Sequence, residues 1–203
     1  MFLWLIIIAL GIFADQITKY LAVLFLRPVD TVPLLEDVLH LTYVENPGAA
    51  FGMLKDSRWV FMIVSTVAII ALLAYMLVRR PKDKLECLAI SLIVSGGIGN
   101  MIDRVLLGYV VDFVDFRLIN FAVFNVADIF VCVGAGLLFL WIILSTVKEA
   151  RAEKEAALAA QNADESEDMS NSDADRMTDA DDLDTKEESD TENGAEEVED
   201  GQA

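Results

Sequence analysis

The sequence has few of the residues that build disulfide frameworks and metal sites. Its 203 residues include two cysteines and one histidine. Cys87 and Cys132 fall toward opposite ends of two apolar segments, and this separation argues against a disulfide between them. Neither has a histidine or second cysteine at metal-ligand spacing, and His40 has no evident partner. We therefore expect no metal or other cofactor, and we interpret both cysteines as small buried apolar residues.

Positive charge is nearly absent from the last quarter of the chain. Residues 155–203 hold nineteen acidic side chains against two basic ones, a net charge of −17. Residues 1–154 carry a net charge of −1, so the total of −18 says nothing about the partners of this larger part. The acidic part also lacks aromatic residues and cannot bury enough apolar surface to offset chain entropy. We predict a disordered acidic tail over 151–203 and expect no nucleic-acid partner.

Long apolar runs dominate the part that precedes this tail, residues 1–150. A membrane-spanning helix needs about 20 mainly apolar residues. The first apolar run has no basic residue ahead of it and no small-residue cleavage site behind it, so we interpret it as a span rather than a removed signal peptide. We predict a mainly α membrane domain with four transmembrane helices, over 2–26, 59–78, 86–107 and 124–147.

Basic residues gather on one side of the predicted spans. The loops 27–58 and 108–123 hold four basic residues over a long stretch of chain. Seven others lie close to two membrane edges: Arg79, Arg80, Lys82, Lys84, Lys148, Arg151 and Lys154. The positive-inside rule then places both termini in the cytoplasm and the two longer loops at the outer surface.

Polar motifs mark the outer ends of these spans. Asp112 lies in VVDF and Asp128 lies in FNVAD. An ionisable side chain near hydrocarbon costs roughly 3 kcal/mol on insertion scales, so each is a candidate functional residue. Asn125 shares a helix face with Asp128, and Asn100 shares one with Arg104. We therefore expect these five side chains to converge at the outer leaflet, in a membrane-embedded acid–base site.

Three further motifs have structural and functional interpretations. Asp15 and Lys19, in DQITK, are four residues apart near the middle of the membrane. Asp15 is either a catalytic or transport carboxylate or, as the adjacent cation favours, part of a buried structural ion pair. Asp103 lies in GGIGNMIDR, where the glycines favour close helix packing and the carboxylate could pair with the arginine beside it. Asn46 and Gly48, in ENPGAAFG, form either a turn that another chain approaches closely or a plain helix-entry turn.

Taken in order, these five motifs resemble those of lipoprotein signal peptidase, also called signal peptidase II, over about residues 1–150. The resemblance implies a bacterial membrane aspartyl protease that cuts prolipoproteins just before a diacylglyceryl-modified cysteine. It implies a catalytic pair, Asp112 and Asp128, and an extracytoplasmic β-cradle and interfacial segment built from 27–58 and 108–123. The supporting residues that it implies are Asp15, Asn46, Gly48, Asn100, Asp103, Arg104, Asn125 and Ala127.

Two carboxylates in a poorly solvated site share a proton, and such a pair can activate water. We expect prolipoproteins and membrane lipids as partners, and a monomer in the bacterial cytoplasmic membrane. A competing interpretation is a small proton- or ion-coupled transporter, which would distribute polar residues through the full thickness of the membrane. The polar motifs instead gather toward the outer edge, and Asp15 is the only clear mid-membrane acid. A structural scaffold would need no acidic motifs with asparagine at fixed offsets.

Overall fold

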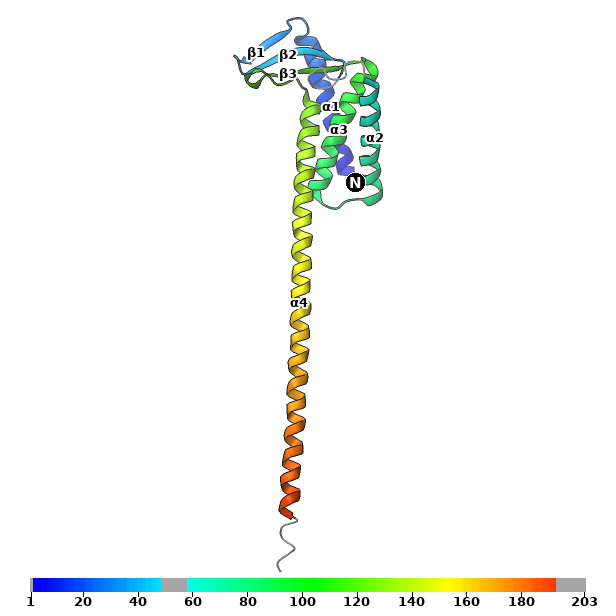
Figure 1. Ribbon diagram of the computed structural model, residues 1–203. Coiled ribbons are helices and arrows are strands. Elements are labelled where there is room, and N and C mark those ends of the chain that lie inside the picture. Colours follow the sequence, from blue (N-terminus) through cyan, green and yellow to red (C-terminus); the bar gives the residue numbers. More distant parts are fainter. Residues whose placement is uncertain (1, 49–57, 193–203) are drawn as a thin grey trace, which may run out of the picture. The chain divides into compact units, whose positions relative to one another are not determined.

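The computed structural model describes residues 2–48 and 58–192, which divide into two compact units, Met1–Leu144 and Ser145–Ala203. Among the described residues, four helices are long and apolar enough to cross a membrane, which confirms the four predicted spans. The elements, drawn in Figure 1, are α1 (Phe2–Phe25), β1 (Thr31–Leu35), β2 (Leu39–Asn46), α2 (Arg58–Arg79), α3 (Lys84–Leu106), β3 (Val110–Phe116), the short 3-10 helix η2 (Arg117–Ile119) and α4 (Val126–Glu192).

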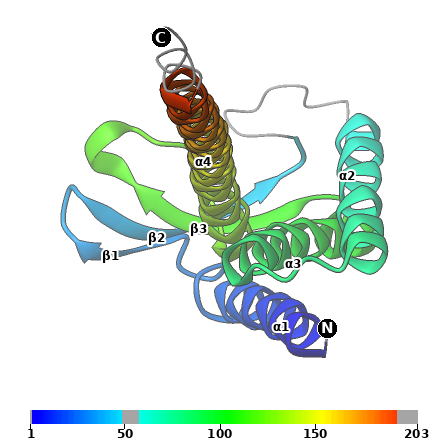
Figure 2. The ribbon, with the colours of Figure 1, turned by 90° about the horizontal axis from the view of Figure 1, so that it is seen from below.

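Helix α3 lies at the centre of the first unit. It packs against both α1 and α2, and Figure 2 shows it between them. Half of its apolar span is buried (50%), compared with 0% for the span of α2. The outward faces of the surrounding helices carry exposed leucine, isoleucine and valine side chains. Such faces suit contact with lipid, because each helix satisfies its own backbone hydrogen bonds.

Glycines allow α3 and α4 to approach each other closely. A Cβ atom added at Gly96 would collide with the backbone carbonyl of Ala127. One added at Gly134 would lie 2.8 Å from the carbonyl oxygen of Ala89. Because backbone atoms cannot move aside cheaply, a larger residue at either position would push the helices apart. The predicted close packing of the GGIGN glycines is therefore confirmed at Gly96.

A small antiparallel sheet with strand order β1-β2-β3 lies at one end of the helices (Figure 1). Ala22 and Leu26, at the end of α1, form a buried cluster with Val111 and Phe113 of β3. Because side chains alternate along a strand, this packing turns Asp112, between those two residues, toward the other face. The expected sheet in the two longer loops is confirmed, and its position outside the cytoplasm stays a prediction.

The second unit contains the continuation of α4, which is helical to Glu192. The predicted disorder of the acidic tail is therefore not confirmed. Residues 148–160 are rich in alanine, glutamate and lysine, which favour helix. A helix already formed in the preceding apolar segment also removes the cost of nucleating a new one. The domain boundary predicted at residue 150 falls near the division between the units and remains a prediction.

Candidate active site

Strand β3 supplies the first candidate carboxylate, Asp112, which is only 2% exposed. Its Oδ2 atom accepts a hydrogen bond from Asn46 Nδ2 at 2.9 Å, and its Oδ1 atom accepts one from Asn125 Nδ2 at 2.6 Å. Burial raises the pKa of Asp112 to about 6, and the carboxylate of Asp128 adds to the rise, while the two amide donors oppose it. Asp112 can therefore exchange a proton near neutral pH.

The first turn of α4 supplies the second carboxylate, Asp128. Asn125 immediately precedes the helix, and its Oδ1 atom accepts from the backbone N–H of Asp128 at 3.0 Å. In return, Asp128 Oδ2 accepts from the backbone N–H of Asn125 at 3.2 Å. This reciprocal pair is a capping box, with aspartate in the place of the usual glutamate. The spacing in FNVAD thus both starts the helix and holds Asp128 in place.

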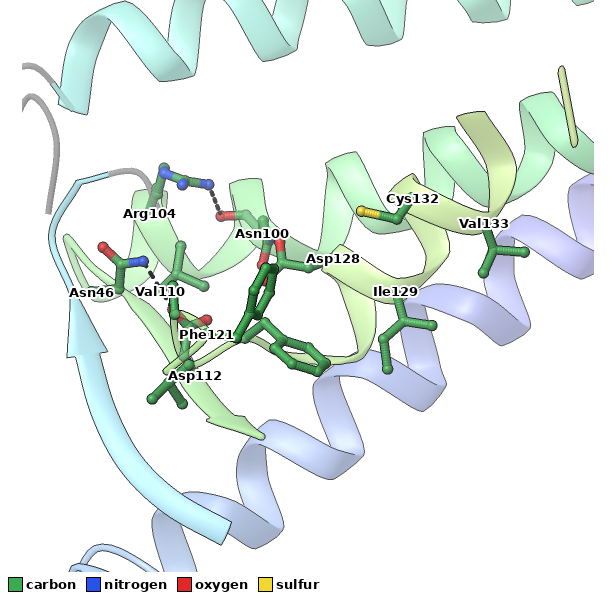
Figure 3. Close-up of a pocket in the computed structure, with 13 residues that line it drawn as sticks. Asn46, Asn100, Arg104, Val110, Asp112, Phe121, Asp128, Ile129, Cys132 and Val133 are labelled. Atoms are coloured by element: carbon green, nitrogen blue, oxygen red, sulfur yellow. Dashed lines mark hydrogen bonds between the residues drawn. The ribbon is translucent and has the colours of Figure 1, made fainter. Parts of the chain in front are cut away.

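Two asparagines connect the carboxylates to each other. Asn125, which is fully buried, donates from Nδ2 to Asp112 and also to Asn100 Oδ1 at 3.1 Å. Asn100 in turn donates from Nδ2 to Asp128 Oδ1 at 2.8 Å. Both aspartates line one cavity of about 460 Å³, shown in Figure 3. The structure therefore brings together the pair and the two asparagines that the sequence predicts to converge.

Arg104 lies at the edge of this cavity. Its guanidinium donates to the carbonyl oxygen of Asn100 at 3.2 Å and to that of Gly48 at 3.4 Å. Gly48 is further held by its backbone N–H, which donates to Asn46 Oδ1 at 3.0 Å. Arg104 thus ties α3 to the end of β2. The neighbouring small residues of ENPGAAFG, 49–52, lie outside the described residues.

Beside the cavity lies an ionic cluster formed by Asp15, Lys19 and Asp103, each at most 4% exposed. Lys19 Nζ lies 2.9 Å from Asp15 Oδ2 and 3.0 Å from Asp103 Oδ2. The predicted ion pair of Asp15 and Lys19 is confirmed. The alternative that Asp103 pairs with Arg104 is wrong, because Asp103 faces α1 and its cation is Lys19.

This ionic cluster also accepts hydrogen bonds from the backbone next to each catalytic candidate. Asp15 Oδ1 accepts from the backbone N–H of Ala127 at 2.9 Å, and Asp103 Oδ2 accepts from that of Val111 at 3.1 Å. Ala127 directly precedes Asp128, and Val111 directly precedes Asp112. Lys19 reaches further, donating to Asn100 Oδ1 at 2.8 Å. The cluster therefore helps to position Asp112 and Asp128 by fixing the residue that precedes each of them.

Reasoning from the sequence missed the role of Gln16. Its Nε2 atom donates to Asp103 Oδ1 at 3.0 Å and to the carbonyl oxygen of Gly99 at 3.2 Å. Its position inside the DQITK motif was a signal of a possible role. Spacing along one helix, however, does not show toward which neighbouring helix Gln16 points. Cys132 corrects a prediction: it is exposed and lines the cavity one turn after Asp128, whereas Cys87 is buried as expected.

Asp115, only three residues after Asp112, does not line the cavity. It accepts hydrogen bonds from Arg117 Nε and from Thr42 Oγ1, each at 2.8 Å. Burial works against the shift, but these two donors hold the pKa of Asp115 below its usual value.

His40 is also buried, and within the described part of the chain neither ring nitrogen has a hydrogen-bond partner. The same part contains no group of three or more potential metal-binding side chains.

Comparison with known proteins identifies the family. The family model described as signal peptidase (SPase) II matches residues 7–144. The chain belongs to the signal peptidase II family. Lipoprotein signal peptidase from Caldanaerobacter subterraneus is 49% identical over 134 residues, covering 66% of this chain and 91% of the relative. The one from Clostridioides difficile is 46% identical over 141 residues, covering 70% of this chain and 95% of the relative.

A solved structure described as a bacterial membrane enzyme has the same fold. It aligns with a TM-score of 0.67 at 31% identity, over 72% of this chain and 90% of the other. As a member of the signal peptidase II family, the chain is an aspartic-type membrane peptidase of lipoprotein processing, as its motifs predicted. The alternative of an ion-coupled transporter is not favoured.

Proposed function

We propose that this signal peptidase II cleaves prolipoproteins just before a diacylglyceryl-modified cysteine and that Asp112 and Asp128 form its catalytic pair. The observation that carries the assignment is that both carboxylates line one cavity and are joined through Asn125 and Asn100. Each carboxylate is held by neutral amide donors, and the described residues contain no cation in salt-bridge contact with either. Such a pair can hold one proton between two sites.

The mechanism needs no covalent intermediate. Two close carboxylates in a poorly solvated site do not ionise together easily, so one retains a proton. The ionised member takes a proton from water as the water oxygen bonds to the scissile carbonyl carbon. The protonated member donates to the carbonyl oxygen and stabilises the developing charge. Collapse breaks the carbon–nitrogen bond, and the leaving amine of the modified cysteine takes up the proton that the first carboxylate removed from water, so the pair again holds one proton. The pair titrates as a unit, with no fixed assignment of the resting proton.

The polar residues around the pair divide into two groups. Asn46, Asn100, Arg104 and Asn125 line or adjoin the cavity and can hold the substrate main chain, while Gly48 leaves room beside it. The second group supports the first: Asp15, Lys19 and Asp103 anchor the backbone at Ala127 and at Val111. Effects on substrate binding are therefore expected mainly from the first group.

The proposed orientation follows from the basic residues, which put both termini in the cytoplasm. The sheet and the catalytic pair then lie at the outer surface of the membrane, where the acyl chains of a substrate can remain in lipid. Exposed Leu118, Ile119 and Phe121, at and beside η2, suit an interfacial position there. We propose prolipoproteins as the substrates, and we expect the enzyme to act as a monomer.

The experiment is cleavage of a diacylglyceryl-modified prolipoprotein by Asp112→Asn and Asp128→Asn enzymes in detergent or lipid. We expect each to lose at least about 10²–10⁴-fold in turnover, the range for removal of a general acid or base. Asp115→Asn is the matched control, since it removes a carboxylate of the same strand that does not line the cavity, and should stay near normal. Near-normal turnover by a folded Asp112→Asn or Asp128→Asn enzyme would sink the assignment.

A further inference from the structure

A second cavity, of about 380 Å³, lies at the opposite end of the helices from the sheet. Its lining residues come from the first turns of α1, the last turns of α2, the loop between α2 and α3, and Cys87 in the first turn of α3. Figure 1 shows where these elements lie. It shares no lining residue with the candidate active site. Its size is within the range of about 300–1,000 Å³ that is usual for small-molecule sites.

The walls of this cavity are apolar. Leu5 and Ile8 line it from α1, and Leu73, Met76 and Leu77 line it from α2. Leu5 is 48% exposed and Leu77 is 56% exposed, so the cavity is bordered by the surface that the two helices present outward. In a membrane, that surface faces acyl chains. A hydrocarbon chain can enter between the helices without leaving polar groups unpaired, whereas a peptide strand could not.

One residue that lines the cavity is basic. Arg80 lines it, directly after the last residue of α2, in the left-handed backbone conformation (φ 47°) in which helices commonly end. Arg79, Lys82 and Lys84 lie in the same short segment. The one acidic residue of this segment, Asp83, caps the N-terminus of α3.

The two acidic side chains near Arg80, those of Asp83 and Glu86, accept hydrogen bonds from other groups. The Asp83 carboxylate accepts from the backbone N–H groups of Leu85 and Glu86, and the Glu86 side chain accepts from the hydroxyl of Tyr75. Within the described residues, Arg80 forms no salt bridge. Its guanidinium is therefore available to an anion at the edge of an apolar cavity.

We propose that this cavity binds an anionic phospholipid, with one acyl chain between α1 and α2 and the phosphate at Arg80. Basic pockets between transmembrane helices on the cytoplasmic side are a recurrent site for acidic lipid headgroups. The proposed orientation puts this end of the helices at the cytoplasmic leaflet. The site takes a structural or modulating lipid at one membrane surface, while peptide cleavage is assigned to the other.

Trp4 lines the cavity and can report on its occupancy. Replacing the other two tryptophans (Trp59→Phe and Trp141→Phe) leaves Trp4 as the single tryptophan, whose indole can be excited selectively over tyrosine. Phospholipids brominated on the acyl chain quench indole fluorescence on contact. The full-length protein is reconstituted in mixed bilayers in which either phosphatidylglycerol or phosphatidylcholine carries the bromine. We expect brominated phosphatidylglycerol to quench Trp4 at several-fold lower mole fraction than brominated phosphatidylcholine.

Two adjacent arginines provide the matched comparison. Arg80→Gln and Arg79→Gln each remove one charge at the same membrane edge, so they change the general attraction to an anionic surface equally. Only Arg80 lines the cavity. We expect Arg80→Gln to abolish the preference for phosphatidylglycerol and Arg79→Gln to preserve most of it. Arg80→Asn serves as a second variant, because asparagine tolerates the left-handed conformation.

Two outcomes would overturn the lipid site. Equal quenching by the two lipids in the Trp4 protein would show no selective binding. Equal loss of preference in the Arg79 and Arg80 variants would show attraction to the surface as a whole. Prolipoprotein cleavage is not the readout, so failure of the catalytic assignment and failure of the lipid site are told apart.

Discussion

Two groups of carboxylates lie side by side in this enzyme and are satisfied in different ways. In the ionic cluster, Asp15 and Asp103 share the ammonium group of Lys19. In the candidate catalytic pair, Asp112 and Asp128 accept hydrogen bonds from amide groups. A cation beside a carboxylate favours its charged form, whereas neutral donors leave the charge state more open to the surroundings. The first arrangement suits a fixed support, and the second suits proton exchange.

The two groups meet at Asn100. Its Oδ1 atom accepts from Lys19 Nζ and from Asn125 Nδ2, so its Nδ2 atom is left to donate to Asp128. With the amide turned round, its NH₂ group would face two other donors, and the Oδ1 atom of Asp128 would lose its donor. The support thus determines which atom of Asn100 faces the catalytic pair. This coupling predicts separable effects on stability and on proton chemistry.

The largest effect on stability is expected from Lys19→Met. The substitution leaves the buried carboxylates of Asp15 and Asp103 without their cation, and breaking a buried ion pair in this way costs about 3–5 kcal/mol. Denaturant unfolding in detergent measures the loss. Lys148→Met, which removes an exposed lysine, is the control and should change stability by less than about 0.5 kcal/mol. Equal small effects of the two substitutions would contradict the supporting role of the ionic cluster.

In the ionic cluster, losing a charge should destabilise the fold. In the catalytic pair, ionisation of Asp112 should destabilise it. The folded-state pKa of Asp112, about 6, is raised from an ordinary value of 3.8. The folded state therefore binds this proton more tightly than the unfolded state does. The resulting contribution to the free energy of unfolding is fully present below pH 3.8 and is lost as the pH rises through about 6. The loss is on the order of 3 kcal/mol. Unfolding of wild type and Asp112→Asn at about pH 4 and about pH 7.5 measures it.

Asp112→Asn should lack this loss, so the stability difference from wild type should shift in favour of the variant as the pH rises. Asp115 provides the opposite case, because its lowered pKa gives a contribution that is present above the ordinary value and lost as the pH falls. A difference between wild type and Asp112→Asn that does not change with pH would refute the raised pKa.

The membrane architecture was predictable because the four spans are continuous apolar runs. Helices α1, α2 and α3 follow them closely, whereas α4 continues beyond its predicted span to Glu192. The convergence of Asp112, Asp128, Asn100 and Asn125 was also predictable, since helical spacing and the basic residues place their motifs at one end. The resemblance, rather than strand periodicity, supplied the sheet: β1 is exposed along its whole length and has no alternating pattern of burial.

Other features depend on how neighbouring helices are rotated, which spacing within one helix does not reveal. Asp103 and Arg104 are adjacent in the sequence, yet Asp103 faces Lys19 on α1 while Arg104 faces the cavity. Cys132 looked like a buried apolar residue, but α4 turns it into the cavity below Asp128. Only the tertiary arrangement separates residues that support the site from residues that line it.

The smallest and most specific change is expected from Asn46→Ala. Asn46 donates one of the two amide hydrogen bonds that lower the pKa of Asp112, and it does not touch the ionic cluster. Its removal should raise that pKa by about one unit, equivalent to about 1.4 kcal/mol. Because the pair titrates together, the Asp112-dependent limb of the pH profile of cleavage should move upward by a similar amount. Loss of turnover with an unchanged pH profile would instead assign Asn46 to substrate binding alone, and the amides would then not control the charge of the pair.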